Sequence, residues 1–138
     1  PHDNFDPQGA MFMAYIIKQF ANNQNPIVIS GNGSQVRDFI HSEDAARGMI
    51  LAAERSAGPV NLCSGKETTI KEVVEILAKN TNYKGTIVYN TSKPFGDKRR
   101  VPDTTKLRAL GFEPRVNLEE GIMNTFEWYL KYRNQKSG

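Results

Sequence analysis

The stretch Gly31-Asn32-Gly33-Ser34-Gln35-Val36-Arg37-Asp38-Phe39-Ile40-His41-Ser42-Glu43-Asp44 contains a turn, a strand and the start of a helix. Glycines at both ends of Gly31–Gly33 favour a turn, because glycine readily adopts positive φ. The apolar run Ile27–Ser30 precedes this turn and Val36–Ile40 follows it. A hairpin with these two strands is therefore predicted.

A helix is predicted from Glu43 to about Arg55, directly after this hairpin. Ser42 is a good N-cap, and the helix dipole favours acidic residues such as Glu43 in the first turn. Apolar residues recur at helical spacing, which predicts the buried face. This face contains Ala46, Met49, Ile50 and Ala53.

The rest of the chain alternates between helical and extended patterns. Helices are expected at 8–22, from Thr69 to about Asn80, after Asp103 and from Asn117 onward, and strands at 60–63 and 86–89. Thr69 and Glu72 have the spacing of a capping box. The predicted class is α/β, or α+β for this chain taken alone, with a few short strands and about five helices. Residues 1–138 are expected to form one domain.

Composition favours a soluble globular protein, because 38% of the 138 residues are hydrophobic and 24% are charged. No apolar run reaches the ~18 residues of a membrane helix, and the first residues do not resemble a secretory signal. Cys63 is the single cysteine, which excludes an internal disulfide and predicts a cytoplasmic protein. The net charge is +3, and the densest basic cluster is Lys98-Arg99-Arg100. This cluster is either a solvated loop or an anion site.

Several catalytic and metal-binding patterns are absent from the sequence. The two histidines, His2 and His41, are far apart and do not predict a zinc site. Gly31-Asn32-Gly33 lacks the third glycine of a dinucleotide fingerprint. Tyr132 and Lys136 have the Tyr-x-x-x-Lys spacing of a reductase pair, but they lie at the exposed chain end and are interpreted as coincidence. No catalytic, cofactor-binding or metal-binding residue is therefore expected in this chain.

Arg37 is the most informative single residue, because it is a cation on a predicted strand whose residues Val36, Phe39 and Ile40 are apolar. Alternation places its side chain on the face opposite Val36 and Asp38. A half-buried guanidinium needs a partner, which is either an internal carboxylate or the phosphate of a ligand held by the planar fork. The sequence pattern leaves both alternatives open.

The chain resembles the second half of extended short-chain dehydrogenase/reductases that act on nucleotide sugars, the NAD-dependent epimerase/dehydratase family. The matching segments are Pro1–Phe5, Gly31–Ala46 and Val60–Gly65, in order and with similar spacing. The pattern Gly-x-Gly-x-x-x-Arg-Asp-Phe-Ile-His-x-x-Asp is the most specific of these. Pro1–Phe5 and Ser92-Lys93-Pro94, with Arg99 behind it, are most similar to the GDP-L-fucose synthase branch.

This resemblance implies a two-part enzyme. A Rossmann half would carry NAD or NADP and the catalytic Tyr-x-x-x-Lys set, and a smaller carboxy-terminal half would cover the nucleotide sugar. This chain corresponds to the second half, and alone it is expected neither to bind the cofactor nor to turn over substrate. The helix at 42 and the strand at 60 would pack against the missing half, so the chain alone would expose apolar surface and could form a homo-oligomer.

The resemblance also assigns roles to individual residues. Arg37 matches an arginine that grips the nucleotide diphosphate, Lys93 matches a basic residue on the covering loop, and Asn4 falls in the segment that lines the sugar site. Arg99 and Arg100 are weaker candidates for substrate binding. A nucleotide-diphosphate sugar is therefore the expected partner, and nucleic acid and membranes are not expected.

Three positions depart from the GDP-L-fucose synthase pattern. Met11 replaces the histidine that acts as an acid in epimerisation, Gln19 replaces an arginine associated with phosphate, and Ser30 replaces an aromatic residue at the guanine site. A thioether cannot donate a proton. The resemblance therefore implies a sister enzyme such as a 4-epimerase or dehydratase. The alternative is a stand-alone anion- or nucleic-acid-binding module that uses Lys98–Arg100.

Overall fold

The computed structural model describes residues 11–92 and 96–136. Within these residues the chain forms five helices and five short strands, which agrees with the predicted class of a few short strands and about five helices. The helices are α1 (Phe12–Ala21), α2 (Ser42–Arg55), α3 (Ile70–Asn80), α4 (Thr105–Ala109) and α5 (Leu118–Lys136). The strands are β1 (Ile27–Ser30), β2 (Val36–Asp38), β3 (Glu67–Thr69), β4 (Ile87–Asn90) and β5 (Arg99–Arg100).

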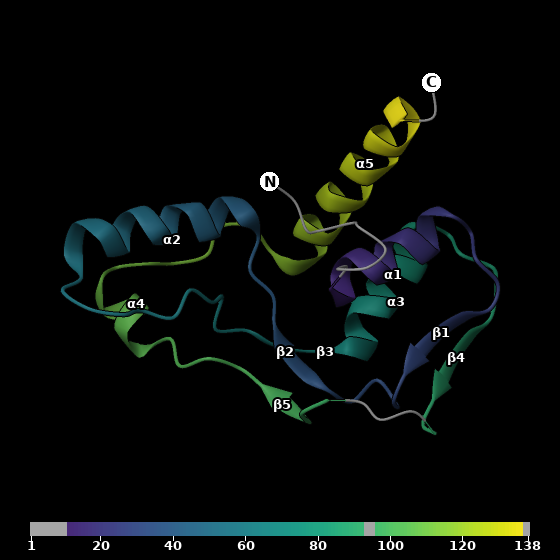
Figure 1. Cartoon of the computed structure of the whole chain (residues 1–138), viewed down its shortest axis with the longest axis horizontal. Coiled ribbons are helices and arrows are strands. Elements are labelled where there is room, and N and C mark those ends of the chain that lie inside the picture. Colours follow the sequence, from purple (N-terminus) through teal and green to yellow (C-terminus); the bar gives the residue numbers. More distant parts are fainter. Residues whose placement is uncertain (1–10, 93–95, 137–138) are drawn as a thin grey trace.

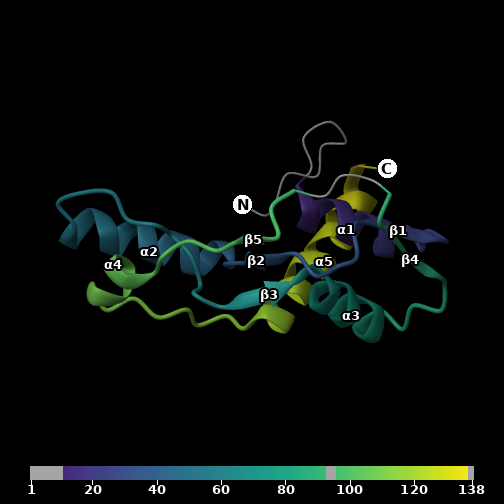
Figure 2. The same ribbon diagram turned by 90° about the horizontal axis from the view of Figure 1, so that it is seen from below.

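The elements gather in two groups that β2 and β3 connect. Figure 1 shows α1, α3, β1 and β4 at one end and α2 with α4 at the other, while α5 packs against α1 and α3 and its carboxy-terminal end extends away from them. The view from below shows the same separation (Figure 2). The buried residues of the first group come from α1, α3, α5 and β1 and form the hydrophobic core.

The predicted hairpin is wrong. β1 pairs in parallel with β4, whereas β2 pairs with β3 and β5 in a separate sheet of order β3-β2-β5. After the turn, the amides of Ile70 and Lys71 donate to the carbonyls of Gln35 and Gly33, so the start of α3 engages this segment instead of β1. Gly33 has φ +80°, and a Cβ there would lie 2.6 Å from the Tyr89 ring.

Helix α3 is the element that the sequence predicts best. Thr69 and Glu72 form the reciprocal capping box, with the Thr69 amide donating to Glu72 Oε2 at 2.6 Å and the Glu72 amide donating to Thr69 Oγ1 at 3.1 Å. The expected apolar face is buried. It consists of Ile70, Val73, Val74 and Leu77.

The predicted burial of α2 is wrong, although its bounds are nearly correct. His41 rather than Ser42 is the N-cap, because its Nδ1 accepts the Glu43 amide at 3.4 Å. The four residues expected inside are all exposed. Gly48 is buried instead, and a Cβ there would lie 2.9 Å from Leu62 Cδ2 and 3.3 Å from Phe112 Cε2. Periodicity identified an apolar face correctly but did not show whether this chain covers it.

Residues 60–63 do not form the predicted strand, and the neighbouring strand is β3 instead. The segment after them is fixed by Asp38, whose carboxylate accepts the amides of Ser64 at 2.7 Å and Gly65 at 2.6 Å. None of the helices in the described ranges has the length and apolar character that crossing a membrane requires.

Candidate functional site

Arg37 lies at the centre of the three-stranded sheet. In register it faces Thr68 of β3 on one side and Arg100 of β5 on the other. Adjacent strands are about 4.8 Å apart, so Arg37 and Arg100 project side by side from the same face. The sheet therefore brings together two of the candidate substrate-binding arginines.

The Arg37 side chain is half-buried and is held by backbone carbonyls. Its Nη1 donates to Val36 O at 2.8 Å and to Asp97 O at 2.9 Å. A Cβ at Gly96 would lie 3.8 Å from Nη2. Among residues 11–92 and 96–136, Arg37 forms no ion pair with a carboxylate. The internal ion pair left open by the sequence is therefore not formed with the described residues.

Arg99 is placed differently from Arg100. It is in register with Val36, so its side chain leaves the opposite face of the sheet, where its guanidinium pairs with Glu67. Arg99 Nη2 is 2.5 Å from Glu67 Oε1, and Nε donates to Oε2 at 3.3 Å. This hydrogen bond from Arg99 lowers the pKa of Glu67 and raises the pKa of Arg99. The structure does not bring Arg99 to Arg37.

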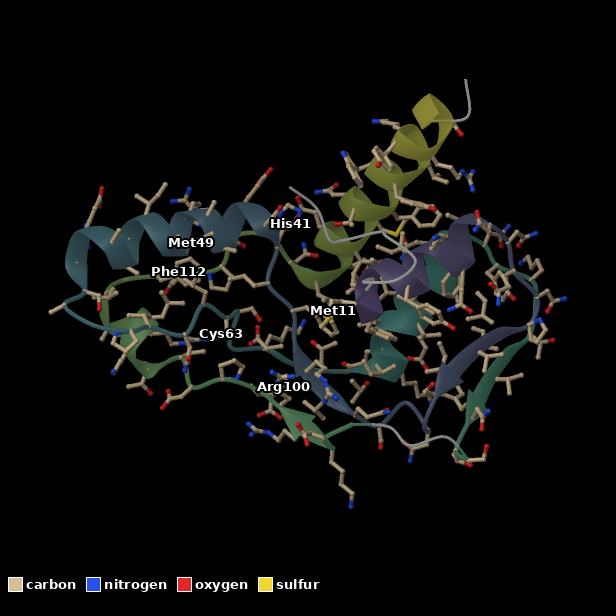
Figure 3. All side chains as sticks on the ribbon, in the orientation of Figure 1. Met11, His41, Met49, Cys63, Arg100 and Phe112 are labelled. Carbon is tan, nitrogen blue, oxygen red and sulfur yellow. The ribbon has the colours of Figure 1, made fainter. Side chains whose placement is uncertain are left out.

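Lys93 and Asn4 lie outside the described residues. Asp97, on the same β4–β5 connection as Lys93, reaches Arg37 through its carbonyl. Of the three departures from the GDP-L-fucose synthase pattern, Met11 is exposed at the start of α1 (Figure 3) and Ser30 is exposed at the end of β1. Gln19 is buried in α1, and its amide has no hydrogen-bond partner among the described residues.

Asp44 is an organising residue whose role the sequence reasoning missed. It is 1% exposed and accepts the amides of Arg115 and Val116, both at 2.9 Å, and Nη1 of Arg47 at 2.5 Å. Burial raises the pKa of its carboxyl, but the hydrogen bonds from Val116, Arg115 and Arg47 outweigh burial and hold the pKa below its ordinary value. Asp44 thereby fixes the segment before α5 to the start of α2. Asp44 is the last residue of the pattern Gly-x-Gly-x-x-x-Arg-Asp-Phe-Ile-His-x-x-Asp, and this position is the sequence signal that could have identified it.

A pocket of about 430 Å³ lies where the end of β2 and the starts of α2 and α5 meet. Its lining is largely apolar, with polar groups from Asp38, His41, Ser42, Asn117 and Thr125. The sequence did not predict this pocket. Arg37 is not among its lining residues, and Arg100 lies on the β5 side, away from His41 (Figure 3).

Cys63 is a buried cysteine whose surroundings disfavour its thiolate form. It is 2% exposed, and burial together with the negative charges of Asp38 and Asp103 raises the pKa of its thiol. The thiolate, which is the reactive form of cysteine, is therefore disfavoured.

The sequence also matches known proteins. Residues 1–63 match the NAD dependent epimerase/dehydratase family. The chain is 31% identical to the GDP-L-fucose synthase of Escherichia coli strain K12, over 100% of this chain and 48% of that protein. This chain is related to the NAD-dependent epimerase/dehydratase family. A second relative, GDP-L-fucose synthase 1 of Arabidopsis thaliana, is 34% identical over 95% of this chain and 42% of its own length.

Solved structures of the same kind share the fold. The UDP-glucose 4-epimerase of Thermotoga maritima, solved with UDP-glucose, superposes with a TM-score of 0.84 at 29% identity, over 96% of this chain and 44% of that one. The GDP-L-fucose synthetase of Naegleria fowleri bound to NADP gives 0.84 at 27% identity, over 97% and 44%. The chain thus spans less than half the length of these nucleotide-sugar epimerases and synthases. The resemblance stated from the sequence is confirmed.

Proposed function

We propose that this chain is the substrate-binding part of an NAD(P)-dependent nucleotide-sugar epimerase, dehydratase or reductase. The observation that carries the proposal is the half-buried Arg37 guanidinium, which is held by carbonyls and forms no ion pair with a carboxylate of the described residues. Planar guanidinium groups bind phosphate oxygens through two parallel hydrogen bonds. Arg100, its neighbour in register, adds a second positive charge on the same face.

Within this proposal Arg37 holds the nucleotide diphosphate and Arg100 neutralises its charge. Lys93 and Asn4 are proposed contacts to the diphosphate and the sugar, and Arg99 is the weakest candidate because Glu67 engages it. Such contacts position the sugar for chemistry that other residues carry out. The acid that relatives of the GDP-L-fucose synthase branch use is replaced by Met11, which favours a reaction without that proton transfer.

The Gly31–Gly33 turn does not have the form of a dinucleotide-binding turn. The Gly31–Gly33 turn leads into β2 and not into a helix, so no helix N-terminus follows it to receive a pyrophosphate. NAD or NADP, which supplies the hydride chemistry, is therefore proposed to bind the part of the enzyme outside this chain. The chain alone is proposed to be inactive.

A direct test measures binding of UDP-, GDP- and dTDP-sugars to the chain by calorimetry, with single-stranded DNA as a competing ligand class. Removing one charge-assisted hydrogen-bonding group costs about 1.5–3 kcal/mol, so Arg37→Ala is expected to weaken binding roughly 10- to 150-fold. Arg55→Ala, the matched control on exposed α2, is expected to bind like the wild type. Unchanged affinity in Arg37→Ala, or binding of DNA alone, contradicts the proposal.

A further inference from the structure

A second pocket, of about 200 Å³, lies between β3 and the segment that leads into α5. Its lining includes two cationic side chains and three uncharged polar ones, which are Lys66, Arg115, Ser64, Thr68 and Asn117. Figure 2 shows β3 beside the start of α5, with β5 on the other side of β2. Arg37 and Arg100, the proposed diphosphate contacts, do not line this pocket. It is called here the β3–α5 pocket, and the proposed function leaves it unassigned.

Thr68 is the residue that points to a ligand in the β3–α5 pocket. It is 2% exposed, and its hydroxyl forms no hydrogen bond with residues 11–92 and 96–136. A buried hydroxyl ordinarily has a partner, because leaving it unpaired costs free energy. The Thr68 oxygen is not sealed inside the protein, in contrast to the unpaired amide of Gln19, so it opens on the pocket that Thr68 lines. A ligand oxygen in the pocket would supply the missing partner.

Lys66 and Arg115 bring two positive charges to the same pocket. Both side chains are exposed, and neither forms an ion pair with a carboxylate in the part of the chain that the structure describes. Their backbones are fixed, because the Arg115 amide donates to Asp44 Oδ2 at 2.9 Å and the Lys66 amide donates to Ser64 Oγ at 3.1 Å. Two available cations beside an unpaired hydroxyl are the groups that bind an oxyanion.

The carboxylates that adjoin the lining residues are engaged elsewhere. Each has a hydrogen-bond or ion-pair partner, and they belong to Asp38, Asp44, Glu67, Glu72 and Glu120. Hydrogen bonds from Thr69 lower the pKa of Glu72, and Lys66 adds to this effect from beyond ion-pair distance. Asp44 already takes two amides of the segment before α5. An anion in the pocket must therefore be held by side chains.

We propose that the β3–α5 pocket binds a phosphate group, with Arg115 and Lys66 neutralising its charge and the Thr68 hydroxyl donating to one of its oxygens. The planar guanidinium of Arg115 can donate to two phosphate oxygens at once. The volume of about 200 Å³ lies below the ~300–1,000 Å³ of pockets that enclose larger ligands, so it suits a free phosphate or a small phosphate ester. This site goes beyond the proposed function, because it uses none of the residues assigned to the nucleotide sugar.

The test titrates the chain with inorganic phosphate and follows the backbone amide signals by NMR. Chloride keeps the ionic strength constant, which separates binding from screening. The wild type is expected to show saturable shifts centred on Lys66, Thr68 and Leu118. Arg115→Ala removes an exposed side chain and is expected to weaken binding about tenfold or more. Lys84→Ala, at an exposed lysine between α3 and β4, is the matched control and is expected to bind like the wild type.

Two further titrations sharpen the result. Thr68→Val keeps the shape of the side chain and removes the hydroxyl, so it is also expected to weaken phosphate binding. Methyl phosphate distinguishes the two sources of the group, because affinity at least equal to that of phosphate assigns the pocket to a small ester, and weaker binding assigns it to free phosphate.

The contradicting outcomes are specific. Equal affinity of the wild type and Arg115→Ala overturns the proposal, as do shifts that never saturate or that spread over exposed lysines throughout the chain. Shifts centred on Arg37 and Arg100 would assign the phosphate to the proposed diphosphate contacts instead. Arg115→Ala is expected to leave nucleotide-sugar binding unchanged, so failure of this proposal is distinguishable from failure of the proposed function.

Discussion

Replacing Asp44 tests whether one buried carboxylate fixes α2 to the segment before α5. Asp44→Asn retains the shape but removes the charge that receives Arg115 N–H, Val116 N–H and Arg47 Nη1. The amide also turns a donor toward groups that are themselves donors. Losing charged hydrogen bonds at a buried site costs about 3–5 kcal/mol. For a chain of this size, each kcal/mol of lost stability lowers the thermal midpoint by about 3–5 °C, so the midpoint is expected to fall by roughly 9–25 °C.

Urea and thermal unfolding, followed by circular dichroism, measure this effect, and Glu43→Gln on the exposed side of the same helical turn is the matched control.

The stabilisation by Asp44 is also expected to depend on pH, with a sign that follows from its pKa. Because the folded pKa of Asp44 lies below its ordinary value, its stabilisation is present above the unfolded pKa near 4 and is lost as pH falls through the folded pKa. The difference between wild type and Asp44→Asn should therefore shrink in acid. A change in unfolding free energy below about 0.5 kcal/mol at neutral pH would refute the reasoning, since that is the scale of neutral surface substitutions.

Two more predictions follow from close packing. Gly48→Val is expected to destabilise the chain by about 1–3 kcal/mol in urea unfolding, because its side chain would overlap Leu62, whereas Gly58→Ala has open space and should be neutral or slightly stabilising. A urea midpoint of Gly48→Val equal to that of the wild type would contradict the close contact between Gly48 and Leu62. Cys63 is expected to react slowly with a thiol reagent in the native chain and fully in urea, because it is buried and its thiol pKa is raised. Equal rates in both conditions would contradict this placement.

Local features of the fold could be predicted from the sequence because the residues involved are close in the chain. The Thr69–Glu72 capping box and the buried face of α3 depend on spacings of three and four residues. Pairing of β1 with β4 joins Ile27 to Ile87, and no local pattern encodes such a contact. The hairpin prediction failed for this reason, since turn chemistry at Gly31 and Gly33 does not determine which strand is the partner.

The candidate site was predictable in part. Arg37 was identified because a cation on a strand with apolar residues needs a partner, and the structure places it beside Arg100. The carbonyl of Asp97 that holds it comes from a distant connection and has no sequence signal. The exposure of Met49 and Ile50 was expected from the family resemblance but not from periodicity, which reports apolar character and not its covering partner.

The two consecutive residues Arg37 and Asp38 project from opposite faces of β2. One carries the guanidinium beside Arg100, and the other accepts the amides of Ser64 and Gly65. The three residues of β2 thus position both the Arg37 guanidinium and the segment that leads away from residues 60–63. Because Arg37 and Asp38 share a peptide group, the hydrogen bonds that Asp38 accepts from Ser64 and Gly65 also restrain the backbone that carries the Arg37 side chain.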